Sequence, residues 1–252
     1  MIDQSKQTPK IFIGTLEHGE SEFEECLESI QKQQRINFEH KIIRNLPEHK
    51  AHKFLFDSWE KVRQSYDAFV KIDADNILID SKGIFNMYQL MKEKMGSGIQ
   101  VRCIDYFSKQ LVPGPTMFST QVEFKRAKRK LFPDHVDSNH SRMLKNEEVL
   151  AIEPIGFHAK YPNPRQSFFY GFHRELKGQR DLINNLYRNW IDERDEARRW
   201  AVIGALDASK FIIMKWAFDS RFVFYRYSKL RKETFTDQVI VHEFEKIYGF
   251  VS

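Results

Sequence analysis

The sequence predicts an α/β fold in which a mostly parallel sheet is flanked by helices and followed by a helical C-terminal extension. Over the first hundred residues, short apolar runs alternate with segments whose apolar residues recur at helical spacing. After residue 158 the pattern becomes mainly helical. We therefore expect a first domain over residues 1–176 and a basic, aromatic extension over residues 177–252 that packs on it.

The expected elements follow one another in a regular order. The first strands are apolar runs ended by polar residues, at 10–16, 40–44 and 68–72. The helices between and after them are expected at about 21–34, 50–65 and 83–94. Ser21 is the expected N-cap of the first helix, because Glu24 stands three residues later at the capping-box spacing. This order favours a parallel sheet with helices on both faces.

The second half gives a weaker pattern. Further strands are expected at 99–107 and 149–157, and helical stretches near 121–131 and 138–146 lie in the polar, basic region between them. The segment from 158 to 177 contains Pro162, Pro164 and Gly171 and is expected to be a loop that closes over a ligand.

Composition places the chain among soluble globular proteins. Of its 252 residues, 41% are hydrophobic and 30% charged, which is too apolar for a disordered chain. The two cysteines, Cys26 and Cys103, are expected to be small buried hydrophobes in a reducing compartment. There is no signal-peptide pattern at the start and no apolar run of about 18 residues. These features predict a cytoplasmic protein.

Asp73 and Asp75 follow the expected strand at 68–72. Ligands of parallel α/β sheets bind beyond the carboxyl ends of the strands, and Thr15 and Arg44 also stand at such ends. Two carboxylates one residue apart can hold Mg²⁺ or Mn²⁺ and bring it to phosphate oxygens. A pair that only caps or salt-bridges is the structural alternative.

Three ordered motifs resemble the GT-A fold, family 2-like glycosyltransferases. They are Ile11-Phe12-Ile13-Gly14-Thr15, then Cys26-Leu27-Glu28-Ser29-Ile30 with Gln33, and Phe69-Val70-Lys71-Ile72-Asp73-Ala74-Asp75-Asn76. The last is similar to the metal-binding DXD strand of that family. The resemblance covers about the first hundred residues and implies a Rossmann-like GT-A domain over 1–176. It also implies a nucleotide-diphosphate sugar as donor and Mn²⁺ or Mg²⁺ as cofactor.

The resemblance implies roles for particular residues. Asp75 would be the principal metal ligand, Asp73 would approach the metal or the ribose, and His158 would complete the metal shell. Thr15 and Glu17 would line the base and ribose pocket, and Lys53 would contact the nucleotide.

Two basic residues of the segment 158–177 are further candidates for donor binding. Lys160 and Arg165 stand among aromatic residues there, and cations of this kind suit a diphosphate. An ordinary surface loop that leads into a basic helix is the alternative.

The catalytic base is where the chain departs from the family. Inverting members carry an acidic pair at the start of a late helix, and this sequence has no clean copy of it. Asp134 and Asp137 are the nearest equivalents, although Asp137 suits the N-cap of a helix equally well. Whether the enzyme inverts or retains stays open.

The tail carries aromatic and basic residues together. Between Phe211 and Lys232, six aromatic rings alternate with arginines and lysines, in a chain whose net charge is +5. An interfacial helix on an anionic membrane has this composition, and so does a helix whose rings pack in the core.

Three other functions are alternatives to a glycosyltransferase. A haloacid-dehalogenase-like phosphohydrolase would use Asp73 as nucleophile, but its motif belongs on the first strand. A sugar nucleotidyltransferase would need a glycine-rich basic loop after the first strand, where Glu17-His18-Gly19-Glu20 stands. A basic module that binds membranes or nucleic acid leaves the ordered carboxylates unexplained. The sequence therefore predicts a metal-dependent hexosyltransferase of surface-glycan biosynthesis, with a saccharide or lipid-linked acceptor and no nucleic-acid partner.

Overall fold

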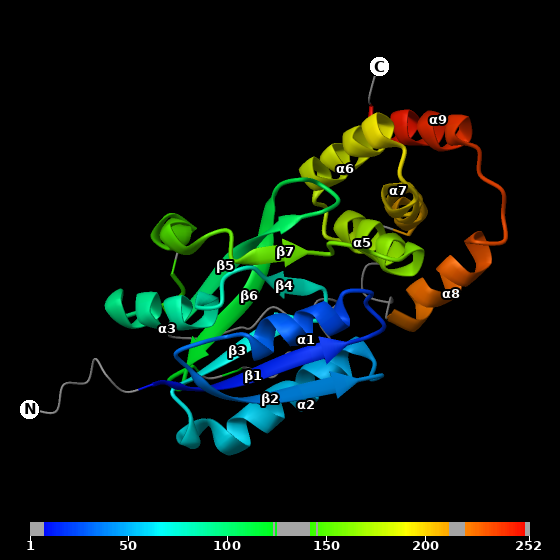
Figure 1. The fold of residues 1–252 in the computed structure, drawn as a ribbon. Helices are drawn as coiled ribbons and strands as arrows, with labels where there is room; N and C mark the ends of the chain where they lie inside the picture. The colour runs from blue at the N-terminus through cyan, green and yellow to red at the C-terminus, as the bar shows by residue number, and fades with distance from the viewer. Residues whose placement is uncertain (1–7, 123, 125–141, 145, 212–219, 250–252) are drawn as a thin grey trace, which may run out of the picture. The chain divides into compact units, whose positions relative to one another are not determined.

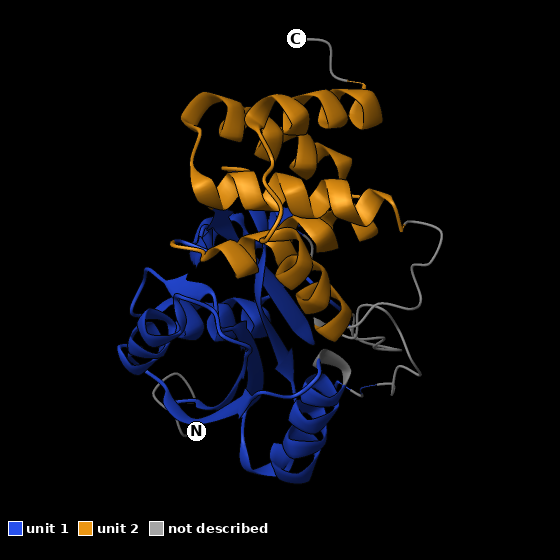
Figure 2. Ribbon diagram, turned by 90° about the vertical axis from the view of Figure 1, so that its right-hand side faces the viewer, with its two compact units in different colours: residues 1–105, 110–160 blue, residues 106–109, 161–252 orange. Residues whose placement is uncertain are grey.

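The computed structural model describes residues 8–122, 124, 142–144, 146–211 and 220–249 (Figure 1). These residues belong to two units, coloured separately in Figure 2. Unit 1 comprises residues 1–105 and 110–160, and unit 2 comprises 106–109 and 161–252. The first unit therefore ends after Lys160, before the 1–176 domain expected from the sequence would end.

Unit 1 contains a seven-stranded sheet in the order β2-β1-β3-β6-β5-β7-β4. The strands are β1 (Lys10–Glu17), β2 (Asn37–Arg44), β3 (Ala68–Asp73), β4 (Asn76–Leu78), β5 (Gly98–Asp105), β6 (Leu111–Ser119) and β7 (Gly156–His158). The pairs β1–β2, β1–β3 and β5–β7 are parallel, whereas β3–β6, β5–β6 and β4–β7 are antiparallel. The sheet is therefore mixed, and the prediction of a mostly parallel sheet was wrong.

Strand β6 is the main reason for this difference. It follows β5 directly and lies between β3 and β5, antiparallel to both. Its sequence contains Pro113 and Pro115, which argue against a central strand because proline cannot donate to the ladder. The prolines lie outside the register that β6 shares with β3, and Pro113 stands at a register shift against β5. A bulge is where a sheet accommodates proline.

The mixed sheet still gathers most strand ends at one edge. Because β6 is antiparallel to both neighbours, β5 runs in the same direction as β3, and β7 runs with β5. The carboxyl ends of β1, β2, β3, β5 and β7 therefore share an edge. Strand β4 runs the opposite way and begins at that edge, directly after the turn that follows β3.

The helices of unit 1 are α1 (Phe23–Gln31), α2 (Glu48–Val62), α3 (Gly83–Glu93) and α4 (Asn146–Val149), with short 3₁₀ turns at Arg63–Ser65 and Leu150–Ile152. Helices α1 to α3 confirm the three predicted early helices. The residue before α1 is Glu22 and no side chain caps its first turn, so the Ser21 N-cap was wrong.

The strand predicted at 149–157 was also wrong over most of its length. Val149 ends α4, and Glu153 turns its carboxylate onto the backbone N–H and the guanidinium of Arg102, both at 2.7 Å. Only 156–158 pair as a strand. The helical stretches predicted near 121–131 and 138–146 lie largely outside the described residues.

Two apolar layers cover the faces of the sheet. On one face Phe12, Trp59 and Phe69 pack together, and Trp59 stacks on Phe69 at 5.5 Å between ring centroids. On the other face the cluster includes Cys26 and Cys103, both fully buried and free. The expectation that both cysteines are small buried hydrophobes is confirmed.

Unit 2 is helical, with α5 (Pro164–Leu176), α6 (Arg180–Glu193), α7 (Glu196–Ser209), α8 (Ser220–Leu230) and α9 (Asp237–Tyr248). The loop predicted at 158–177 is therefore mostly helix α5. The side chain of Asn163 accepts a hydrogen bond from the backbone N–H of Gln166, and Pro164 occupies the first turn, where proline is tolerated.

Gly171 is one of the residues that predicted a loop, but it lies in α5, where it allows close packing against α7. A Cβ on Gly171 of α5 would lie 1.7 Å from the carbonyl oxygen of Ala201 in α7. A Cβ on Gly204 of α7 would lie 2.2 Å from the carbonyl oxygen of Phe168. Glycine at both positions lets the two backbones approach. Among the described residues, no helix is long and apolar enough to cross a membrane.

Candidate metal and nucleotide site

The turn between β3 and β4 carries the two aspartates at the shared strand edge. Asp73 ends β3, and Asp75 lies in the turn before Asn76 opens β4. The backbone N–H of Ala159 donates to the carbonyl of Asp75 at 2.9 Å, and Asn76 stands in register with His158. Pairing of β4 with β7 therefore brings the aspartate turn and His158 together, although about eighty residues separate them in sequence.

His158 lies between two carboxylates. Its Nδ1 is 2.7 Å from Oδ1 of Asp105, which is fully buried at the end of β5, and its Nε2 is 3.4 Å from Oδ2 of Asp75. A carboxylate accepts and cannot donate, so we assign the hydrogen of the neutral ring to Nδ1. The Nε2 lone pair is then directed toward Asp75.

Asp73 is held differently. Its side chain is 52% exposed, and Oδ1 lies 2.6 Å from Nζ of Lys71 on the same strand. Its backbone carbonyl lies 3.7 Å from Sγ of Cys26. The structure thus brings Asp75 and His158 together and gives Asp73 a lysine partner.

Further carboxylates gather near Asp75. Glu17, at the end of β1, accepts from the backbone N–H of Gly19 at 2.7 Å, and Glu20 accepts from His18 N–H at 2.6 Å. Burial raises the pKa of Glu20 to about 7, and the negative charges of Asp75 and Glu17 add to the effect. Such a concentration of negative charge is relieved by a cation.

The donor set suits a divalent cation completed by a ligand. Among the described residues, no three or more His, Cys, Asp or Glu side chains form a complete metal-binding group. Mg²⁺ in nucleotide enzymes commonly takes one or two protein carboxylates and fills its shell with phosphate oxygens and water. Two neighbouring ligand atoms that each lie about 2.1 Å from an octahedral metal are about 3.0 Å from each other. The distance of 3.4 Å between Nε2 of His158 and Oδ2 of Asp75 is close to this separation.

Two neighbours support this fit. The hydrogen bond from a ligating histidine to a buried carboxylate is the usual outer contact of a metal site, and Asp105 supplies it. Asn76 is buried and donates to Oδ1 of Asp75 at 2.8 Å, whereas its own Oδ1 has no hydrogen-bond partner among the described residues. Asp75 and His158 therefore fit Mg²⁺ or Mn²⁺.

The other predicted donor-binding residues of unit 1 are placed less favourably. Thr15 is fully buried, and its hydroxyl lies 2.9 Å from Nε2 of His40, whose pKa burial lowers to about 4. Lys53 pairs with Asp57 on its own helix, α2. Of these residues, Thr15 has no exposed surface to offer a nucleotide.

Lys160 lies closer in sequence and structure to the candidate site. It follows the His158–Ala159 segment, and its Nζ is 3.8 Å from Oε2 of Glu25 and 5.6 Å from the ring centre of Phe157. Arg165 belongs to α5 of unit 2, where its guanidinium lies 5.8 Å from the ring centre of Phe224. Asp134 and Asp137 lie outside the described residues.

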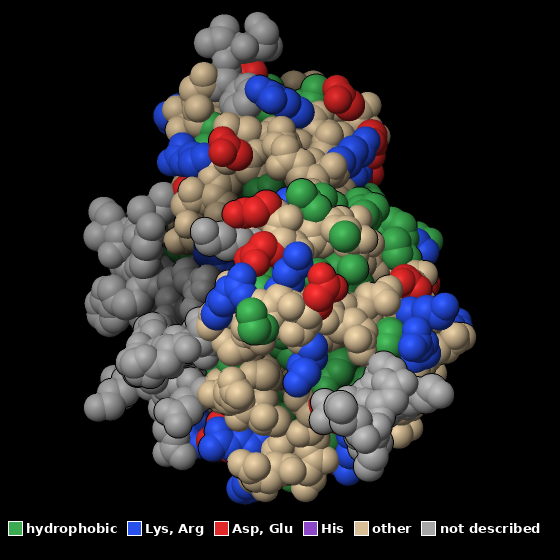
Figure 3. All heavy atoms as spheres, turned by 90° about the vertical axis from the view of Figure 1, so that its left-hand side faces the viewer, with side chains coloured by type: hydrophobic (Ala, Val, Ile, Leu, Met, Phe, Trp, Pro, Cys, Tyr) green, Lys and Arg blue, Asp and Glu red, His purple; other side chains and the backbone are tan. Residues whose placement is uncertain are grey.

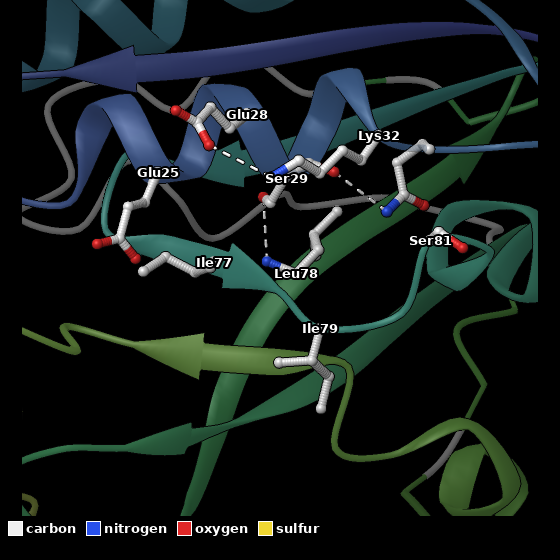
Figure 4. Close-up of a pocket in the computed structure, with 9 residues that line it drawn as sticks. Glu25, Glu28, Ser29, Lys32, Ile77, Leu78, Ile79 and Ser81 are labelled. Carbon is white, nitrogen blue, oxygen red and sulfur yellow. Dashed lines mark hydrogen bonds and ion pairs between the residues drawn. The ribbon is translucent and has the colours of Figure 1, made fainter.

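A pocket of about 420 Å³ opens beside the site, between α1 and β4 (Figure 4). It is lined by Glu25, Glu28, Ser29, Lys32, Gln33, Ile77, Leu78, Ile79 and Ser81. Its central polar groups are used within the fold, because Ser29 Oγ accepts from Leu78 N–H at 3.1 Å and the Gln33 amide accepts from Ile84 N–H at 3.0 Å. None of the predicted site residues lines this pocket.

Positive charge is not concentrated on the face drawn in Figure 3, where basic, acidic and apolar side chains are interspersed. The net charge of +5 therefore gives no single-sign surface on that face.

Sequence reasoning missed two groups of this site. Asp105 lies within the strand predicted at 99–107 and ends β5 in the structure, at the same edge as Asp73, so a carboxylate near that strand end was a usable signal. Glu20 follows the predicted pocket residue Glu17 by three residues, and this acidic segment was the available signal.

Comparisons with known proteins give little further support. No protein-family model matches the chain, and no curated protein matches it in sequence. Among solved structures, the chain is similar to a mannosyltransferase, PcManGT from Pyrobaculum calidifontis, in complex with GDP-Man and Mn²⁺. The match covers 96% of this chain and 85% of the other, with 10% identity and a TM-score of 0.41. A likeness of this degree carries no argument about fold or function.

Proposed function

We propose that this protein is a metal-dependent glycosyltransferase that uses a nucleotide-diphosphate sugar. The observation that carries the proposal is the line of side chains from Asp105 through His158 to Asp75, at the carboxyl edge of the sheet. The ordered GT-A family 2-like motifs of the first hundred residues give the same assignment. In this proposal the DXD motif is Asp73-Ala74-Asp75.

Asp75 and His158 would hold Mn²⁺ or Mg²⁺, and Asp105 would fix the imidazole so that Nε2 faces the metal. A bound divalent cation neutralises the diphosphate of the donor and the charge that develops on it as it leaves. Glu17, at the end of β1, would accept hydrogen bonds from the ribose. Lys160 would approach the diphosphate from the segment that follows His158.

In the proposed reaction, the bond between the anomeric carbon and the diphosphate oxygen breaks, and a bond forms between that carbon and an acceptor hydroxyl oxygen. The hydroxyl proton passes to a carboxylate base, and Asp137 or Asp134 is the proposed group. The proposed acceptor is a saccharide or lipid-linked saccharide of surface-glycan biosynthesis. The proposed setting is the cytoplasm, with contact to the inner face of the membrane.

Calorimetric titration of UDP into the protein with Mn²⁺ tests the site, and GDP, CMP and dTDP extend the test to other nucleotides. We expect binding of one of them to require Mn²⁺ and to fall below detection in Asp75→Ala. Asp57→Ala on α2 is the matched control, because it removes a carboxylate that pairs with Lys53 on the same helix and is not a candidate metal ligand. Equal binding by the Asp75→Ala protein and the native protein would sink the site assignment.

The phosphohydrolase alternative predicts a different result. It requires hydrolysis of simple phosphate monoesters that is lost in Asp73→Asn, together with no metal-dependent binding of any nucleoside diphosphate.

A further inference from the structure

Helix α8 (Ser220–Leu230) has one face directed into unit 2 and one exposed face. On the inner face Val223 and Leu230 are buried, and the guanidinium of Arg226 forms a bidentate pair with Asp207 at 2.5 and 2.8 Å. Tyr227 packs on Phe168, with 5.8 Å between ring centroids. The inner face therefore anchors the helix and neutralises its own arginine.

The exposed face combines aromatic rings with cations. Phe224 is 47% exposed and Tyr225 is 60% exposed, which is unusual for neighbouring large aromatic residues in a soluble protein. Helical spacing places them on one stripe with Arg221 and Ser228. Lys229, Arg231 and Lys232 are exposed at and just after the end of the helix. We call these three residues and the stripe the α8 outer face; it comprises Arg221, Phe224, Tyr225, Ser228, Lys229, Arg231 and Lys232.

The charged residues of α8 are all basic. The sequence of α8 contains no acidic residue, and the first acid after it is Glu233. A further cation comes from α5, because the guanidinium of Arg165 lies over the ring of Phe224. The face therefore differs from the interspersed charges on the surface drawn in Figure 3.

We propose that the α8 outer face docks on an anionic lipid bilayer. Phenyl and phenol rings favour the boundary between headgroups and acyl chains, because they bury an apolar body and keep a polar tip wet. Lysines and arginines beside them meet the negative potential of the surface. Nucleic acid also attracts cations and aromatic rings, but single strands are held in grooves that track their backbone, whereas these rings stand on the outer face of a helix, which suits a flat bilayer surface. This docking specifies the membrane contact of the proposed function, and its test requires no transferase activity.

The test is co-sedimentation of the full chain with vesicles of phosphatidylglycerol in phosphatidylcholine, compared with vesicles of phosphatidylcholine alone. We expect binding to the anionic vesicles only. In Phe224→Ser with Tyr225→Ser, binding should weaken at least about tenfold, because the buried ring area is lost. In Lys229→Glu with Lys232→Glu it should weaken on the order of thirtyfold.

The chain offers matched controls for both changes. Phe54 on α2 is 49% exposed and has the Lys41 ammonium 5.7 Å from its ring centre, so Phe54→Ser repeats the aromatic change elsewhere. Lys92→Glu with Lys94→Glu repeats the charge reversal on α3 and the residue after it. Circular dichroism verifies that every variant is folded. The quenching by brominated lipid that Tyr225→Trp shows in excess of the native protein, which has four tryptophans, reports insertion at position 225.

Several results would overturn the proposal. They are absence of binding to anionic vesicles, equal binding of the outer-face and control variants, and no quenching of the tryptophan at position 225. Binding to a single-stranded oligonucleotide that resists competition by the vesicles would assign the face to nucleic acid instead. Because no donor or acceptor sugar is present, none of these outcomes depends on the transferase proposal.

Discussion

At the residue scale, the candidate site depends on how one imidazole ring is held. Asp105 is fully buried, and a carboxylate in that position is costly unless it is paired and hydrogen-bonded. The 2.7 Å contact with His158 helps to offset that cost and fixes the ring. Removing Asp105 should therefore affect the site through His158, without touching the metal or the nucleotide.

Asp105→Asn is predicted to weaken Mn²⁺-dependent nucleotide binding by about 10- to 100-fold, because an amide can present its NH₂ to Nδ1 and favour the wrong tautomer. Calorimetry gives the affinity, and ¹⁵N shifts of the imidazole report the tautomer. Asp57→Asn, which changes a half-buried carboxylate on α2, should leave both unchanged. Full affinity in Asp105→Asn would show that the ring needs no such support.

Sequence reasoning reached part of this site. Asp73 and Asp75 were predicted as ligands because an apolar strand precedes them, and His158 because it follows a predicted strand. The partnership of His158 with Asp105 depends on parallel pairing of β7 with β5, which sets Asp105 beside His158. No local pattern encodes that register, so it could not be read from the residues.

At the element scale, the sheet is mixed, whereas a mostly parallel sheet was predicted. The predicted site residues nevertheless lie at an edge where the carboxyl ends of several strands meet. The insertion of β6 was missed because Pro113 and Pro115 indicate loop, and a strand bulge could not be foreseen. Because β6 is antiparallel to both β3 and β5, those two strands run in the same direction. The carboxyl ends of β3, β5 and β7 therefore coincide, as a parallel sheet would also have placed them.

The α5–α7 crossing gives the prediction at this scale. Gly171→Ala should destabilise unit 2 by about 1–3 kcal/mol or more, because a Cβ there overlaps the backbone of Ala201. Chemical denaturation followed by circular dichroism measures the change in unfolding free energy. Gly178→Ala is the comparison, because its Cβ would meet nothing within 4 Å and costs only the strain of a φ of +70°, about 1 kcal/mol. A smaller loss for Gly171→Ala than for Gly178→Ala would contradict the packing role.

At the scale of the whole molecule, the candidate site and the proposed docking face lie in different units. The site residues Glu17, Glu20, Asp75, Asp105 and His158 all belong to unit 1, and α8 belongs to unit 2. The two units divide after Lys160, whereas the boundary expected from the sequence lies at residue 176. The metal and the nucleotide should therefore act on unit 1.

Mn²⁺ and the preferred nucleoside diphosphate together are predicted to stabilise the protein, whereas either alone should do so much less, because each completes the site for the other. At ligand concentrations near 100 times Kd, linkage gives about 2.7 kcal/mol, which raises Tm by about 5–10 °C for a chain of this size. Hydrogen exchange should show protection of backbone amides at 73–78 and 156–160, and little change in α6 and α9. Protection confined to unit 2, or a shift that persists in Asp75→Ala, would place the ligand elsewhere.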